Sequence, residues 1–232
     1  MIADRVAAVR ERIVRSAERA SRPPEGVTLV AVSKTFPAEA VRTAFAAGVR
    51  HFGENRVQEG DAKVGALGDL RSAGLTWHFI GHLQSNKARK AALLFDVVQS
   101  VDSVDLAGRL AQAAAEAGRT LRALVQVDLA GETRKFGIPE AEVTAALEAI
   151  SNLEGLRVEG LMVLPPFLED PEELRPYFRR LRLLRDRVAA AGLIAGDALS
   201  MGMSHDFEVA VEEGATIVRV GSAIFGQRTA AA

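Results

Sequence analysis

The chain has 232 residues, of which 48% are hydrophobic and 25% charged, and its 29 basic and 30 acidic side chains nearly cancel. This composition is ordinary for a globular protein and offers no basic surface for nucleic acid or an anionic membrane. Cys is absent, which excludes disulfides and thiolate chemistry, and no apolar run approaches the about 20 residues that span a bilayer. We therefore expect one domain over residues 1–232, in the cytoplasm.

Helical and strand patterns alternate along the chain. Apolar residues at steps of three and four predict an amphipathic helix over residues 2–20. Short apolar runs predict buried strands at 27–33, 51–55, 77–81, 95–100, 121–129, 156–164, 198–201 and 216–220. Between them, helices are expected at 38–47, 104–117, 139–150, 171–191 and 205–213, and a basic helix start at 84–87.

Eight strands separated by helical patterns predict an α/β fold, a single (β/α)8 TIM-type barrel with an extra N-terminal helix. An open, doubly wound sheet is the alternative. Only residues 221–232 follow the last strand, so one helix of the barrel is missing from the tail. We expect the helix over 2–20 to cover the barrel near that gap.

Lys34 ends the first strand abruptly, and its position predicts a ligand site. In barrels and open α/β sheets, ligands bind at the carboxyl ends of the strands. An amine that is partly desolvated there has a lowered pKa and can attack a carbonyl group to form a Schiff base. The alternative is a lysine that simply extends from the strand end into water.

The last two strands are followed by small residues that favour a phosphate site. Residues 200–206 and 218–226 place glycine and serine just past a strand, where backbone N–H groups can approach a phosphate. Ser204 and Ser222 add hydroxyl groups, and Ser204 is also expected to cap the following helix. Two glycine turns and an ordinary helix cap are the alternative interpretation.

Arg219 interrupts an apolar strand between Val218 and Val220, where a charged side chain must find partners. A permanently charged donor inside the barrel mouth suits an aromatic nitrogen that stays unprotonated. Lys34, the phosphate loops and Arg219 together describe pyridoxal 5'-phosphate (PLP): its aldehyde on Lys34, its phosphate on the late loops and its ring nitrogen facing Arg219.

At these residues the chain resembles the pyridoxal phosphate homeostasis proteins, single-domain relatives of the alanine racemase barrel. The matching motifs, in order, are Ala31-Val32-Ser33-Lys34, His51-Phe52-Gly53-Glu54-Asn55, Val57-Gln58-Glu59, Trp77-His78-Phe79-Ile80-Gly81, Leu83-Gln84, Asn86-Lys87, Gly160-Leu161-Met162, Leu199–Ser204 and Arg219–Gly226. The resemblance implies a cofactor covalently bound to Lys34, Asn55 and Met201 beside it, Ser204, Gly221 and Ser222 at the phosphate, and Arg219 at the pyridine nitrogen.

Two positions depart from the family pattern. Position 56 is Arg where the family usually has tyrosine, and position 128 is Asp where asparagine is expected. Arg56 is expected beside the cofactor, so the contacts that tyrosine makes there in relatives are not carried over to this chain. The assignment of Lys34 is unaffected.

A catalytic role is not evident from the residues. A racemase needs two placed acid–base groups, and Lys34 is the one evident here. In the racemases that the chain resembles, the second group is a tyrosine from another domain, whereas the single tyrosine here, Tyr177, belongs to an apolar helix face. The resemblance implies a PLP carrier or regulator without an established reaction, a monomer that supplies PLP-dependent apo-enzymes. The alternatives are a weakly active PLP-dependent amino-acid racemase and a Schiff-base aldolase acting on a sugar phosphate.

The four histidines, His51, His78, His82 and His205, all fall near strand ends. Their spacing gives no shared direction and no carboxylate cluster accompanies them, so we expect no metal site. His51 or His78 is expected to support the cofactor indirectly.

Overall fold

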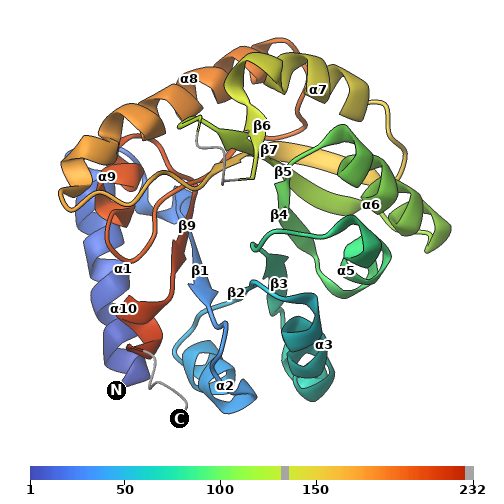
Figure 1. The fold of residues 1–232 in the computed structure, drawn as a ribbon. Coiled ribbons are helices and arrows are strands. Elements are labelled where there is room, and N and C mark those ends of the chain that lie inside the picture. Colours follow the sequence, from blue (N-terminus) through green and yellow to red (C-terminus); the bar gives the residue numbers. More distant parts are fainter. Residues whose placement is uncertain (132–135, 228–232) are drawn as a thin grey trace.

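The computed structural model describes residues 1–131 and 136–227 and shows a closed barrel (Figure 1). Parallel strands follow one another around it in the order β4-β3-β2-β1-β9-β8-β7-β5, and pairing of β4 with β5 closes the ring. The strands are β1 (Thr28–Val32), β2 (His51–Glu54), β3 (Thr76–Phe79), β4 (Val97–Val101), β5 (Leu121–Asp128), β7 (Leu156–Val163), β8 (Ala198–Ser200) and β9 (Ile217–Val220). The predicted barrel is confirmed, and the open sheet is wrong.

Helices surround the barrel. They are α1 (Ile2–Arg19), α2 (Ala38–Ala46), α3 (Val57–Ala66), α4 (Gly68–Ser72), α5 (Ala88–Leu94), α6 (Val104–Glu116), α7 (Val143–Ile150), α8 (Arg175–Ala190), α9 (Phe207–Glu212) and α10 (Ser222–Phe225). Helices α3 and α4 were not predicted, because glycines interrupt their weakly apolar pattern, and the short α10 was not predicted either. Short 3-10 turns occupy Pro24–Gly26, Ser85–Lys87, Glu140–Glu142 and Pro171–Leu174.

The helix expected from residue 139 begins later than the sequence predicts. Pro139 belongs instead to a two-residue strand, β6 (Ile138–Pro139), which pairs with β5. The helix expected over 171–191 also begins later: Asp170 caps a 3-10 turn over Pro171–Leu174, where its Oδ1 accepts a hydrogen bond from the Glu172 amide at 2.9 Å, and α8 follows from Arg175. A proline is compatible with either an extended residue or a first helical turn, so its presence did not fix the boundary.

The main hydrophobic core lies between the strands and the helices. On β3, Trp77 and Phe79 are buried in this core, so the side chain between them, His78, points into the barrel. The same alternation turns three further buried polar residues inward: Gln99 on β4, Ser200 on β8 and Arg219 on β9. The interior of the barrel is therefore partly polar.

Helix α1 closes the gap that follows the last strand. It packs against α9 and α10, as Figure 1 shows, and buries Val6, Val9 and Ile13. Charged contacts extend this packing: Arg12 pairs with Glu208 at 2.7 Å and Arg19 with Glu212 at 2.8 Å. The expected position of the N-terminal helix is confirmed.

None of the helices that the structure describes is long and apolar enough to cross a membrane.

Candidate functional site

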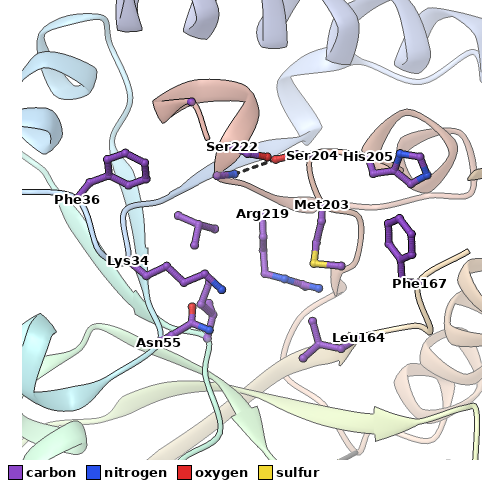
Figure 2. A pocket seen from close by; sticks show the side chains of 14 residues that line it. Lys34, Phe36, Asn55, Leu164, Phe167, Met203, Ser204, His205, Arg219 and Ser222 are labelled. Atoms are coloured by element: carbon purple, nitrogen blue, oxygen red, sulfur yellow. Dashed lines mark hydrogen bonds between the residues drawn. The ribbon is translucent and has the colours of Figure 1, made fainter. Parts of the chain in front are cut away.

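A cavity of about 520 Å³ opens at the carboxyl ends of the strands. All but one of the predicted site residues line it: Lys34, Asn55, Ser204, Arg219, Gly221 and Ser222. Figure 2 shows Lys34 extending toward Arg219, with Asn55 beside it and the two serines on another wall. Side chains far apart in sequence thus meet in one space, because parallel strands end at the same edge of the barrel.

Met201 does not line this cavity. Its side chain is fully buried in the main hydrophobic core, whereas Met203, two residues further along, lines the cavity. The glycine between them adopts φ +91°, and a Cβ there would lie 2.6 Å from the Ala210 Cβ, so position 202 requires glycine. The structure therefore places Met203, not Met201, at the position where a methionine can touch a ligand.

The cavity has wall residues that the sequence analysis did not assign to the site. Its apolar walls come from Val32, Phe36, Ile80, Leu164 and Phe167, and His205 and Gly226 also line it. Local pattern alone gives little signal for them, because each is an ordinary apolar or loop residue until the barrel closes.

The backbone around Lys34 is held by a buried ionic group from α3 and β2. The Lys63 ammonium donates to the Ser33 carbonyl oxygen at 2.6 Å and to Glu54 Oε1 at 2.7 Å. Ser33 Oγ also donates to Glu54, and the Thr35 amide donates to Glu59. Thr35 has φ +69°, a conformation that these contacts stabilise. We call Ser33, Glu54, Glu59 and Lys63 the lysine clamp, since they fix the residues on both sides of Lys34.

Sequence reasoning missed the lysine clamp. The spacing of Glu59 and Lys63, four residues apart on one helix face, is the signal that could have indicated it. Burial raises the pKa of Glu54, and Lys63 opposes this effect. The Lys63 side chain is 7% exposed and that of Glu54 is fully buried, so each is a charge that depends on its partner.

Ser204 and the start of α10 form a polar corner of the cavity. The Gly221 amide donates to Ser204 Oγ at 3.1 Å and the Ala223 amide at 3.4 Å. The expected helix cap at Ser204 is wrong: Asp206 precedes α9, and its Oδ1 accepts a hydrogen bond from the Met203 amide at 2.5 Å. Backbone amides that converge on one oxygen atom suit an oxygen of a phosphate equally well.

The backbone of Asn55 packs directly against Gly81. A Cβ on Gly81 would lie 2.2 Å from the Asn55 carbonyl oxygen, so only glycine lets the end of β3 approach this residue. Asn55 Oδ1 is buried without a hydrogen-bond partner among the described residues. A bound molecule with a donor group would supply one.

Arg219 is held beneath the cavity by neutral oxygen atoms. It is 3% exposed, and it donates to Ser200 Oγ at 2.5 Å and to the Val163 carbonyl oxygen at 2.8 Å. It makes no ion pair within the part of the chain that the structure describes. Burial lowers the pKa of Arg219 to about 10, with the charge of Asp206 opposing the shift, so the guanidinium stays charged at neutral pH.

The two departures from the expected motifs do not line the cavity itself. Arg56 lines a second hollow with Gln58, Gln84 and Lys87, and this hollow shares Asn55 with the cavity, so its expected place beside a cofactor stays a prediction. Asp128 Oδ1 accepts hydrogen bonds from the Ala130 and Gly131 amides and closes the turn after β5.

Two of the four histidines, His82 and His205, make separate contacts. His82 lies 3.2 Å from Asp102, and His205 lies 3.0 Å from the Glu169 carbonyl oxygen. Among residues 1–131 and 136–227, no group of three or more His, Asp or Glu side chains could hold a metal ion.

Comparison with known proteins agrees with this geometry. Residues 5–229 match the family model described as alanine racemase, N-terminal domain, which defines the chain as a barrel of that class. Within that class, the chain belongs to the pyridoxal phosphate homeostasis protein family. The relative of that name from Pseudomonas aeruginosa is 46% identical over 228 residues, covering 98% of this chain and 96% of the relative. The one from Escherichia coli K12 is 44% identical over 232 residues, covering 98% and 97%.

Solved structures give the same result. PipY of Synechococcus elongatus without PLP is 44% identical, with a TM-score of 0.87 over 97% of this chain and 100% of that chain. The structure of PipY described as having PLP bound gives a TM-score of 0.85 over the same shares of the two chains. An alanine racemase of Clostridium difficile 630, 18% identical with a TM-score of 0.69, covers 94% of this chain and 59% of the racemase, which shows a shared fold.

Proposed function

We propose that this chain, as one barrel domain, binds PLP as a Schiff base on Lys34 and maintains the PLP pool of the cytoplasm. The observation that carries the proposal is the meeting of an amine, a cluster of backbone amides and a buried guanidinium in one cavity of about 520 Å³. The names of its relatives and the structure of PipY with PLP bound support it.

Each part of the cavity has a task in this proposal. Lys34 would supply the amine that captures the aldehyde carbon of PLP, with the aldehyde oxygen released as water. Ser204, Ser222 and the Gly221 amide would hold the phosphate. Arg219, as a permanently charged donor, would face the ring nitrogen and favour its unprotonated form. When bound, PLP supplies an electrophilic carbon that an amine can capture and release.

The residues do not favour a racemase. Tyr177 lies on α8 and packs against the main hydrophobic core, and no tyrosine lines the cavity. A second proton-transfer group on the opposite face of a substrate would have to come from elsewhere.

An open mouth suits exchange of the cofactor. Phe167 lines the cavity and is 78% exposed, and Met203 beside it is also exposed, so part of the rim is apolar and accessible. We propose that the chain acts as a monomer and that PLP-dependent apo-enzymes receive PLP from it.

The test is the absorbance of the purified protein before and after borohydride. The protein loaded with PLP is expected to be yellow, and reduction is expected to fix the cofactor on the tryptic peptide that contains Lys34. Lys34→Ala should abolish the absorbance, whereas Lys90→Ala, on a surface lysine paired with Asp61, should not. A wild-type protein that stays colourless after incubation with PLP contradicts the proposal.

Two further arms separate the alternatives. A racemase would exchange the α-proton of an amino acid with deuterated solvent at an enzymatic rate. A Schiff-base aldolase would be trapped by borohydride with a sugar phosphate and not with PLP.

A further inference from the structure

A line of hydrogen bonds runs through the barrel behind Arg219. Ser200 Oγ donates to Gln99 Oε1 at 2.6 Å, Gln99 Nε2 lies 2.8 Å from His78 Nδ1, and His78 Nε2 lies 3.0 Å from His51 Nδ1. Ser200 and Gln99 are fully buried and His78 is 2% exposed, whereas His51, at the start of β2, is half-buried. We call Arg219, Ser200, Gln99, His78 and His51 the interior chain.

The guanidinium fixes the direction of every bond in the interior chain. Because Arg219 can only donate, Ser200 Oγ accepts from it and gives its own proton to Gln99 Oε1. Gln99 therefore turns its amide nitrogen to His78 Nδ1, which must be the unprotonated ring nitrogen. His78 then carries its proton on Nε2 and donates it to His51.

Burial makes the neutral form of His78 the stable one. Loss of solvation, together with His51 and Arg122 nearby, lowers the pKa of His78 well below its ordinary value. A second proton on His78 would meet the Gln99 amide and leave two donors facing each other. The interior chain therefore has one consistent arrangement, with Arg219 donating at one end and His51 accepting at the other.

We propose that Ser200, Gln99 and His78 are positioning residues, which hold the Arg219 guanidinium toward the ligand in the cavity. This inference rests on the proposed function and deepens it. An arginine side chain has several rotatable bonds, and contacts at Ser200 and Val163 restrict the guanidinium to one orientation. The three residues touch no ligand themselves, so they act through the direction of Arg219.

The arrangement also couples the two ends of the barrel. A proton on His51 Nδ1 would oppose the one on His78 Nε2, so protonation of His51 competes with the interior chain. Burial and Arg122 lower the pKa of His51, and Asp96 opposes them. At the other end of the interior chain, the negative charge of Asp206 acts on Arg219 and raises its pKa against the effect of burial. If Gln99 is removed, His78 is released from its fixed tautomer, and His51 becomes easier to protonate.

The decisive variant is Gln99→Leu, which breaks the interior chain and leaves Arg219 and His51 in place. Its control is Ser100→Ala: Ser100 is the next residue on β4, is fully buried, and has no hydrogen-bond partner among the described residues. A second variant, His78→Gln, keeps an acceptor for Gln99 and a donor for His51 and does not titrate.

Two measurements are made on each protein. Nitrogen NMR of the apo protein is expected to show the Nε2–H tautomer of His78 in the wild type and in Ser100→Ala, and a tautomer mixture with a raised His51 pKa in Gln99→Leu. In the loaded protein, Gln99→Leu is expected to weaken PLP binding about tenfold, and to shift the pH midpoint of the Schiff-base absorbance by about one unit. In His78→Gln, the pH midpoint of the Schiff-base absorbance should stay close to that of the wild type.

The outcomes distinguish the two proposals. A wild-type protein that never binds PLP overturns the proposed function, and the tautomer of His78 can still be read. A Gln99→Leu protein that folds, binds PLP and keeps the wild-type midpoint and His51 pKa overturns the positioning role. If Gln99→Leu does not fold, the same comparison is made with Ser200→Ala, which removes one hydroxyl group.

Discussion

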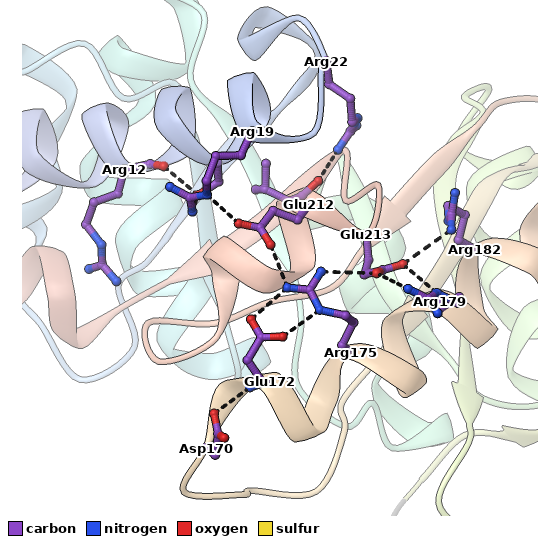
Figure 3. A network of polar contacts seen from close by, with 12 residues as sticks. Arg12, Arg19, Arg22, Asp170, Glu172, Arg175, Arg179, Arg182, Glu212 and Glu213 are labelled. Atoms are coloured by element: carbon purple, nitrogen blue, oxygen red, sulfur yellow. Dashed lines mark hydrogen bonds and ion pairs between the residues drawn. The ribbon is translucent and has the colours of Figure 1, made fainter.

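Arginines are held in opposite ways in two regions of this protein. Inside the barrel, Arg219 donates to neutral oxygen atoms of Ser200 and Val163. On the outside, Arg175 of α8 lies 2.7 Å from Glu172, 2.7 Å from Glu212 and 3.2 Å from Glu213. Figure 3 shows this outer network, which joins α8 to α9 and includes Arg179 and Arg182.

The two environments change the same side chain in opposite directions. Hydrogen bonds to Glu172 and Glu212 raise the pKa of Arg175, whereas burial lowers the pKa of Arg219. Carboxylates on the outside of the barrel, among them the buried Glu213, cancel the charge of Arg175, so the outer network contributes to stability. Neutral acceptors leave the charge of Arg219 uncancelled, and it remains available to a molecule in the cavity.

The largest effect is expected where a buried charge has a buried partner, in the lysine clamp. Lys63→Met leaves Glu54 without its cation and should lower the free energy of unfolding by about 3–5 kcal/mol, measured by urea denaturation at pH 7. Lys90→Met, which breaks an exposed pair with Asp61, is the control and should cost less than about 1 kcal/mol. Equal losses of unfolding free energy in the two variants would show that the buried clamp stabilises the fold no more than an exposed ion pair does.

The pH dependence of the unfolding free energy should separate the interior chain, which contains His78, from the ion pairs on the outside of the barrel. His78 has a lowered pKa in the folded state, so below about pH 6.5 the unfolded chain binds more protons and stability falls as pH falls, by up to about 1.4 kcal/mol per pH unit. Glu172 and Glu208, held below their ordinary pKa by Arg175 and Arg12, lose their contribution only below about pH 4.5.

A comparison of the wild type with His78→Gln isolates the effect of His78 on stability. Burial raises the pKa of Glu54 and of Asp206, so the stability that these two groups contribute is lost as pH rises through their folded pKa. This dependence has the opposite sign to that of His78. Both carboxyl groups remain in the variant and cancel in the difference. Parallel stability profiles of the two proteins between pH 7.5 and 5.5 would contradict a neutral, buried His78.

A smaller effect is expected in the outer network. Glu213→Gln removes the carboxylate that Arg175, Arg179 and Arg182 share, and should lower the free energy of unfolding by about 1 kcal/mol. Because three of these side chains are partly exposed, 1 M NaCl should reduce the difference from wild type. A loss that salt leaves unchanged would indicate packing rather than charge.

The smallest effect is expected for an isolated surface pair. Arg109→Gln breaks the pair of Arg109 with Asp105, four residues apart on α6 and mostly exposed. The midpoint of thermal unfolding is expected to change little, because water screens both charges. A loss as large as that of Glu213→Gln would mean that network formation adds nothing to a single pair.

Much of the candidate site could be predicted from strand ends. Lys34, Arg219 and the glycine and serine residues after the last strands each stood out, because a charged or small residue interrupts an apolar run. Met201 and Met203 show the limit: both follow the same strand, and the left-handed glycine between them decides which one reaches the cavity. No local pattern reports that turn.

By itself, the sequence determined the alternation of eight buried strands with helices, which favours a parallel barrel and leaves an open sheet as the alternative, because each apolar element must be buried against another. It also placed Lys34 and Arg219 at the strand ends. Only the tertiary structure decided their partners: Lys63 reaches Ser33 from α3, and Gln99 reaches Ser200 across the barrel. Such contacts join residues that are distant in the chain, and they form only when the closed sheet brings its inward faces within hydrogen-bond distance.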